Sequence, residues 1–219
     1  MATLADQASK LLSSTRQGLH AAALTTLQIP LRYAQRGRNM AWAAMAGAAV
    51  LNTQRHYPEH DVLDRSNGFR FYYHAHPIEG GMGEHGHFHV FDERGKAFHH
   101  LAALSLDALG RPVRWFCPNR WVTGEVWPSP PDLRDRVTAF HISTRGTMAP
   151  VAAWLQAMFS LFQGEIVALL DVRDQLLLGL DHEQKSTLAE DRQRHVLASS
   201  PIDLPARVQQ ILDTTGDHT

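Results

Sequence analysis

Two short stretches decide the fold: FRFYYHAH at residues 69–76 and EHGHFHVF at residues 84–91. In both, aromatic or small side chains alternate with arginine or imidazole side chains, and a period of two is typical of a β-strand. The segment between them ends in GGMG at residues 80–83 and is too short for the crossover that parallel strands require. The two stretches therefore predict an antiparallel β-hairpin.

Further aromatic and β-branched runs follow the hairpin at residues 98–107 and 113–116, with 120–127 as a candidate fifth strand. The spacers between these runs are short, so we expect an antiparallel meander of about four to five strands over residues 69–127. The three prolines within residues 128–131 end the sheet, because proline is not tolerated inside a central strand.

Helix-forming residues, with apolar positions at intervals of three and four, fill residues 1–56 and 149–198. We expect both segments to be helical and to pack against the sheet. Residues 132–147 fit either a strand or a helix. Because no repeat, low-complexity tract or linker divides the chain, the sequence predicts a single α+β domain spanning residues 1–219.

Charge and cysteine content narrow the class of protein. The chain has 219 residues, and 21 Lys plus Arg against 22 Asp plus Glu leave no basic excess for nucleic acid or an acidic membrane. Cys117 is the single cysteine, which excludes an internal disulfide. The N-terminal residues lack the pattern of a secretory signal. We expect a cytoplasmic protein that acts on a small-molecule substrate and binds neither nucleic acid nor membrane; no oligomeric state is predicted.

Histidine is the unusual residue of this chain. Seven of the 14 histidines fall within residues 74–100, where an even spread would place about two. They are His74, His76, His85, His87, His89, His99 and His100. Side chains two apart in a strand share a face. The pairing that places His74 opposite His87 also places Tyr72 opposite His89, and it gathers the histidines of both strands on one face.

This arrangement predicts a metal site. Opposed Cβ atoms in an antiparallel pair lie about 4.5–5.5 Å apart, close enough for three or four imidazoles to reach one metal ion. The predicted ligands are His74, His76, His85, His87 and His89, and the ion is a divalent transition metal, since iron, zinc and copper all accept imidazole. His99 and His100 are adjacent, so only one can face the site, and neither this choice nor a role for His141 is predicted. The alternative is that the histidines are half-exposed strand residues without a metal.

Three further residues are candidates beside this site. Glu165 falls within an apolar stripe of the helix predicted after Pro150, where it is a candidate metal ligand or general base unless it reaches water. Tyr72 would lie beside the histidines, as a proton donor or as a packing residue. Glu84 is a candidate to orient a ligating histidine, unless it is solvated. Glu165 and Tyr72 are the predicted catalytic residues.

An imidazole site with three or four protein ligands keeps a coordination position for water or substrate, which is the condition for catalysis. The leading expectation is therefore a metal-dependent, non-haem enzyme that oxidises a small molecule with O₂ or hydrolyses it. A non-catalytic metal-binding or histidine-based sensing protein is the alternative. A structural or partner-binding domain without a metal is the third possibility.

Overall fold

A computed structural model of the chain describes residues 4–48, 52–53, 55–75, 83–94, 96–127 and 129–216. The fold is α+β, and consecutive strands are neighbours in one antiparallel sheet, so the expected meander is confirmed. In the part of the chain that the structure describes, the sheet has six strands, where about four to five were expected. They are β1 (His56–Asp64), β2 (Phe69–Ala75), β3 (Glu84–Arg94), β4 (Ala97–Asp107), β5 (Pro112–Pro118) and β6 (Val196–Pro201).

The two additional strands form the edges of the sheet. Strand β6 occupies the end of the segment expected to be helical, and β1 follows the N-terminal helical region directly. Strand β1 contains Pro58, and its pairing with β2 shifts register between Tyr57 and Val62. Proline and register shifts are typical of edge strands, which have no partner on one side. Their weak alternation of polar and apolar residues is the reason that the sequence pattern did not predict them.

For two segments the sequence left the secondary structure undecided. In the structure each contains a short helix and irregular chain. The candidate fifth strand at residues 120–127 contains a short helix, α3 (Arg120–Thr123), capped by the side chain of Asn119. Within residues 132–147 the chain forms α4 (Leu133–Thr138). The helical alternative for residues 132–147 is therefore correct for their first half.

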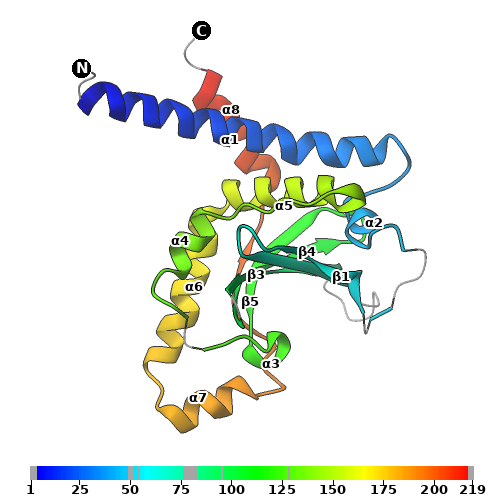
Figure 1. Ribbon diagram of the computed structural model, residues 1–219. Coiled ribbons are helices and arrows are strands. Elements are labelled where there is room, and N and C mark those ends of the chain that lie inside the picture. The colour runs from blue at the N-terminus through cyan, green and yellow to red at the C-terminus, as the bar shows by residue number, and fades with distance from the viewer. Residues whose placement is uncertain are drawn as a thin grey trace.

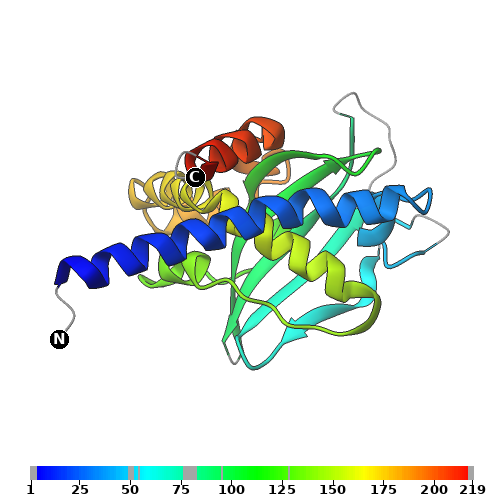
Figure 2. The ribbon, with the colours of Figure 1, turned by 90° about the horizontal axis from the view of Figure 1, so that it is seen from above.

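The other helices lie on one side of the sheet or at its end. They are α1 (Leu4–Ala34), α2 (Met40–Ala44), α5 (Ala149–Leu161), α6 (Gln163–Leu178), α7 (His182–Ala189) and α8 (Leu204–Gly216), with a 3₁₀ turn at Gly146–Met148. Figure 1 shows α5 across one face of the sheet and α1 above α5. Helix α8 packs against α1. Seen from above, α1 crosses α5, and its N-terminal end extends beyond the rest of the protein (Figure 2).

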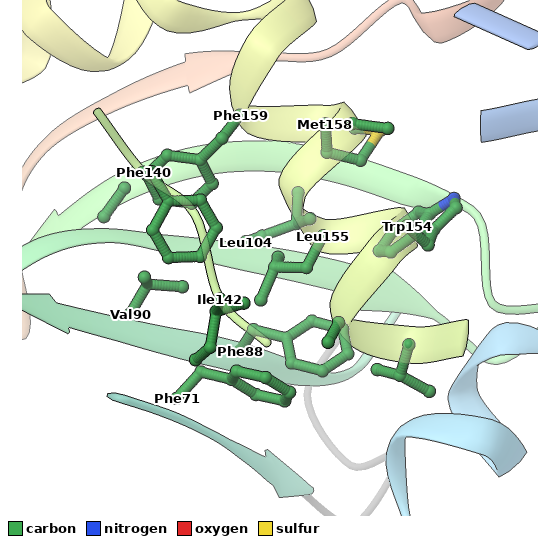
Figure 3. Close-up of a cluster of buried hydrophobic side chains, with 14 of the residues drawn as sticks. Phe71, Phe88, Val90, Leu104, Phe140, Ile142, Trp154, Leu155, Met158 and Phe159 are labelled. Carbon is green, nitrogen blue, oxygen red and sulfur yellow. The ribbon is translucent and has the colours of Figure 1, made fainter. Parts of the chain in front are cut away.

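The face of the sheet beneath α5, here called the core face, is apolar. Figure 3 shows a cluster of buried side chains from strands and helix: Phe71, Phe88, Val90 and Leu104 of the sheet, and Trp154, Leu155, Met158 and Phe159 of α5. Fully burying one such side chain contributes roughly 1.5–3 kcal/mol. This packing holds the central strands against the helices and sets which side of each strand faces away from them.

The opposite side of the same strands, here called the histidine face, carries the imidazoles. By strand register it consists of Arg70, Tyr72 and His74 of β2, His87, His89 and Phe91 of β3, His100, Ala103 and Ser105 of β4, and Phe116 of β5. Most of these side chains are buried, among them His89, His100 and Tyr72. The histidine face is therefore a second interior region of the protein.

Helices α5 and α6 are separated by a sharp bend. The chain turns by 75° between the segments Gly146–Leu161 and Gln163–Leu178, and Phe162 lies at the break. The bend changes which positions face inward, and α6 buries Ile166, Leu169, Leu170, Arg173 and Leu177. No single helix within the described residues is long and apolar enough to cross a membrane; this bent pair meets the criteria of length and composition only jointly.

Candidate functional site

Four imidazoles form a continuous row across three strands of the histidine face. His74 of β2 is paired in register with His87 of β3, as the period-two pattern predicts, and their ring centroids are 5.7 Å apart. The ring of His87 lies 4.7 Å from that of His89, and His89 lies 5.3 Å from His100 of β4. The row therefore brings together side chains from separate strands, as a polydentate site requires.

His89 and His100 form a hydrogen-bonded pair in this row. His89 Nδ1 and His100 Nε2 are 3.1 Å apart, and the two residues are 1% and 0% exposed. Burial lowers the pKa of both imidazoles well below the ordinary value, so both are neutral near neutral pH. One ring then donates a hydrogen bond to the other. His100 Nδ1 is also buried and finds no partner among the described residues.

A β-bulge selects His100 over His99. Val90 pairs with Ala102 and Phe91 with His100, so Leu101 is the extra residue of β4. A bulge of this kind changes which side chains share a face. His99 instead donates from Nδ1 to the carbonyl oxygen of Val126, 3.0 Å away. The sequence did not predict whether His99 or His100 faces the site. The pairing of β3 with β4 determines that it is His100.

A buried ion pair holds the backbone at this bulge. The amide of His100 donates to Glu125 Oε2 at 2.8 Å, and Arg173 Nη1 donates to the carbonyl oxygen of His100 at 3.2 Å. Arg173 and Glu125 are 3.5 Å apart and essentially inaccessible to solvent. Burial raises the pKa of Glu125, and the Arg173 guanidinium opposes that effect. The amide N–H and the carbonyl oxygen of His100 therefore each form a hydrogen bond with a charged side chain.

The sequence predicted no role for Arg173, and it marked Glu125 only as part of residues 119–125, a polar stretch that would suit a pocket wall. The spacing of residues in α6 could have indicated that Arg173 is buried. Arg173 lies seven residues after Ile166 and four before Leu177, on the buried side of the helix. An arginine in such a stripe predicts a buried acidic partner. No comparable pattern marks Glu125, which is brought to β4 by the irregular segment after α3.

Glu84 orients His87. His87 Nδ1 donates to Glu84 Oε1 at 2.7 Å, and Glu84 Oε2 accepts from Arg114 at 3.2 Å. Although burial acts to raise the pKa of Glu84, the hydrogen bond from His87 and the charge of Arg114 keep it below the ordinary value. A carboxylate that accepts from Nδ1 fixes the orientation of the ring and leaves Nε2 as its other nitrogen. This is the orienting role considered for Glu84.

His74 is oriented by a backbone group. Its Nε2 lies 2.6 Å from the carbonyl oxygen of Thr53, so Nε2 carries the hydrogen and Nδ1 is the unprotonated nitrogen of the neutral ring. Burial lowers the pKa of His74, although the hydrogen bond to Thr53 acts in the opposite direction. The neutral form is therefore favoured in this part of the row also.

His85 lies away from the other predicted ligands, which corrects the expectation. Glu84 pairs with Asp107 and Gly86 with Leu106, so His85 is an extra residue at a second register shift. Its Nδ1 lies 2.9 Å from the hydroxyl of Tyr73, a residue of the core face. A Cβ on Gly86 would lie 2.8 Å from Tyr73 Cζ, so glycine allows this ring to lie close to the strand. His76, another predicted ligand, is outside the described residues.

Tyr72 does lie on the histidine face. Its ring stacks on His56 with centroids 3.6 Å apart, and it lies 5.0 Å from the ring of His89. Burial raises the pKa of the Tyr72 hydroxyl, and the charge of Asp61 adds to the effect, so the hydroxyl keeps its proton. His56, for which sequence analysis predicted no role, bonds to Asp61 through Nδ1 at 2.9 Å.

Glu165 and His141 do not belong to this site. Glu165 lies in the first turn of α6 and forms an ion pair with Arg207 of α8. Because the chain bends at Phe162, the apolar stripe of α5 does not continue in phase into α6, and the predicted position of Glu165 is wrong. His141 is exposed and lines a groove together with residues of α1 and α5.

Comparison with known proteins yields a family. Residues 20–202 match the family model described as a domain of unknown function, DUF6969. The chain belongs to the DUF6969 family. The matched region of this DUF6969 protein runs from within α1 to the end of β6 and contains every residue of the histidine face. Neither the curated proteins nor the solved structures contain a match to the chain.

The geometry of the DUF6969 site is that of a partly assembled imidazole cluster. Across the residues that the structure describes, no three His, Cys, Asp or Glu side chains are arranged to hold one metal ion. One pair of ring nitrogens, from His89 and His100, is already close. The adjacent ring of His87 is anchored through Nδ1, which bonds to Glu84. Chemically, the row offers the neutral imidazoles of His74, His89 and His100 and the protonated hydroxyl of Tyr72.

Proposed function

We propose that this DUF6969 protein binds a divalent transition-metal ion through His89, His100 and His87. The observation that carries the proposal is the separation of 3.1 Å between His89 Nδ1 and His100 Nε2. Two nitrogen ligands on a tetrahedral metal, at roughly 2.0–2.1 Å each, lie about 3.3 Å apart. The pair thus needs little movement to exchange its hydrogen bond for two bonds to metal.

The protonation state supports the same assignment. A metal ion binds the neutral imidazole and competes with protons for its nitrogen lone pair. Burial lowers the pKa values of His89 and His100, so protons are weak competitors near neutral pH. In the hydrogen-bonded pair one proton lies between the two nitrogens. That proton must leave, or move to the other nitrogen of its ring, when metal binds.

His87 is the third ligand in this proposal. Its Nδ1 donates to Glu84, so Nε2 is the nitrogen that would reach the ion. The rings of His87 and His89 are 4.7 Å apart, so in this proposal the His87 ring has to shift to bring Nε2 to the ion. His74, with Nδ1 as its unprotonated nitrogen, is the candidate for a fourth ligand. The proposal leaves out His85, which bonds to Tyr73 instead.

A three-imidazole site with an open position supplies Lewis-acid or redox chemistry to a bound substrate when the metal is present. The activity we propose is oxidation of a small molecule with O₂ or its hydrolysis. Tyr72 would hold a proton at its hydroxyl oxygen beside the site, since its raised pKa keeps it protonated. The lone cysteine, Cys117, is buried and reduced, which agrees with a cytoplasmic location as part of this proposal.

Retention or sensing of a metal without catalysis is the second candidate function. The observation that favours it is the near-complete burial of His89 and His100, which limits the approach of a substrate. The two functions differ in whether water occupies a coordination position of the bound ion. Electron–nuclear double resonance on the Cu(II)-loaded protein detects exchangeable water bound to the ion and so distinguishes the two functions. Water on the ion supports the enzyme, and its absence supports retention or sensing.

Metal titration of the full chain tests the proposal. We expect about one equivalent of Co²⁺ to bind with a tetrahedral absorption spectrum, as imidazole sites produce. His100→Phe keeps an aromatic ring of similar size but removes both nitrogens, and it should abolish this spectrum. His141→Ala, at an exposed position, is the matched control and should leave binding unchanged. Stoichiometric binding that survives both His100→Phe and His87→Phe, or no binding to the parent protein, would overturn the proposal.

A further inference from the structure

A separate cavity lies on the other side of the buried ion pair, at the elbow formed by α6 and α7. It encloses about 830 Å³ between these helices and the segment that contains Trp127 and Ser129 (the elbow is visible in Figure 1). Small-molecule sites commonly have volumes of about 300–1,000 Å³ and apolar walls with a few polar groups. This cavity has that size, and no residue of the histidine face lines it.

One wall of the cavity is apolar. Leu177 and Leu178 at the end of α6, Leu180 in the connection to α7, and the ring of Trp127 line it. Leu178 is 81% exposed. An apolar ligand body placed against these side chains would remove them from water, and this is the principal driving force for binding in such cavities.

The opposite wall is polar and comes from one side of α7. Lys185 and Ser186 project from this short helix and line the cavity. Two other cations at the cavity are neutralised: Arg120 by Glu190 at 2.8 Å, and Arg134 by Asp171 and Asp174. Lys185, by contrast, forms no ion pair within the part of the chain that the structure describes. Two carboxylates also line the cavity: Asp174 is paired with Arg134 and Arg173, and Asp181 accepts a hydrogen bond from the Gln184 amide at 2.8 Å as the N-cap of α7. Among the described residues, Lys185 is thus the cation of the cavity that forms no ion pair, and it lies opposite an apolar wall.

We propose that this cavity binds a small organic carboxylate with an apolar body. The carboxylate would pair with Lys185 Nζ and accept a hydrogen bond from the Ser186 hydroxyl, while the body packs on Leu177, Leu178 and Trp127. A single ammonium beside a hydroxyl matches a singly charged group. A phosphate is usually met by several cations or by bidentate arginine, and the arginines here are already engaged by carboxylates.

Calorimetric titration with octanoate tests this site on the full chain. A chelator is present throughout, so the result does not depend on the metal proposal. We expect saturable binding of octanoate at one site and at least about tenfold weaker binding of 1-octanol, because a charge-assisted hydrogen bond is lost. Inorganic phosphate, which has charge but no apolar body, should not compete.

Three variants complete the test. Lys185→Gln should weaken octanoate about tenfold and leave 1-octanol unchanged, since only the charged contact is lost. Leu178→Asn, at an exposed position, should weaken both ligands by a similar factor. Lys96→Gln removes an exposed lysine outside the cavity and is the matched control. Absence of saturable octanoate binding, or binding that Lys185→Gln does not alter, would overturn the proposal.

Discussion

The two faces of the central strands bury opposite kinds of side chain on the same backbone. Phe88 points to the core face and His89, the next residue, to the histidine face, yet they are 0% and 1% exposed. On the core face, apolar burial stabilises without any need for partners. On the histidine face each polar atom needs one, because an unpaired buried polar group destabilises by about 1–3 kcal/mol. Side chains that are equally buried on the two faces therefore contribute differently to the stability of the fold.

The histidine face meets this requirement by local pairs. Glu84 bonds to His87, Thr53 to His74, and His89 to His100. Two of its buried polar atoms, His100 Nδ1 and Ser105 Oγ, remain without a partner among the described residues. A ring nitrogen of an unpaired imidazole can bind an ion, whereas the unpaired polar atoms of the described core residues, Trp115 Nε1 and Trp154 Nε1, belong to indole N–H groups, which can only donate. The predictions below test this contrast between the two faces.

The largest expected effect is the loss of the ion pair behind His100. Arg173→Met leaves Glu125 buried without its cation, and removal of one partner from a buried pair destabilises by about 3–5 kcal/mol. Urea denaturation of the variant measures the change in the free energy of unfolding. Arg120→Met breaks the exposed pair with Glu190 and is the control, with an expected loss below about 1 kcal/mol.

The double variant Arg173→Met with Glu125→Gln should recover part of this loss, since it removes the uncompensated charge. The variant Arg173→Met also tests whether the ion pair positions His100. If Arg173 holds the His100 peptide, Arg173→Met should also weaken Co²⁺ binding in the metal titration. Equal stability losses for Arg173→Met and Arg120→Met would contradict the role assigned to the buried pair.

The second prediction compares neighbouring residues of β4. Leu104 lies on the core face and Ser105 on the histidine face, and both are fully buried. Leu104→Ala should destabilise by about 3 kcal/mol through lost burial and a cavity. Ser105→Ala removes a buried hydroxyl that has no partner among the described residues, so it should be neutral or stabilise by up to about 1 kcal/mol. Thermal and urea unfolding of the two variants measure both values.

A marked loss of stability in Ser105→Ala would show that the hydroxyl is engaged, for example by a bound water. Ser105→Val, which fills the space with apolar atoms, is the companion variant. A stabilising effect of Ser105→Val would strengthen the conclusion that polar groups on this face do not serve stability.

The third prediction is a pH dependence specific to the histidine face. Burial lowers the pKa of His89 and His100 in the folded protein, whereas an unfolded histidine titrates near about 6.5. Below about pH 6.5 the unfolded chain binds protons that the folded protein does not. Stability is therefore complete above that pH and falls as the pH decreases, by up to about 1.4 kcal/mol per pH unit for each such histidine.

Free energies of unfolding measured in a pH series, without metal, test this dependence. His100→Phe should flatten the slope, because one titrating group is removed, and His141→Ala should leave it unchanged. An equal slope in the parent protein and in His100→Phe would show that His100 does not contribute to the acid sensitivity of the fold.

Much of the hairpin could be predicted because strand geometry is local. Alternation along residues 69–76 and 84–91 predicted the pairing of Tyr72 with His89 and of His74 with His87, and both pairs are present. His85 was assigned to the wrong face, since parity fails at an inserted residue. Glu165 was misplaced for a related reason: a helical stripe extrapolates only as far as the helix is straight.

Alternating residue types along the chain were sufficient to define the meander and to gather His74, His87 and His89 on one face, because side-chain direction in a strand depends on the backbone alone. The tertiary structure decided the rest. The bulge at Leu101 brings His100 to His89, and Arg173 and Glu125 hold its peptide from segments distant in sequence. These features depend on packing between segments that are distant in sequence. The periodicity of a single stretch therefore cannot predict them.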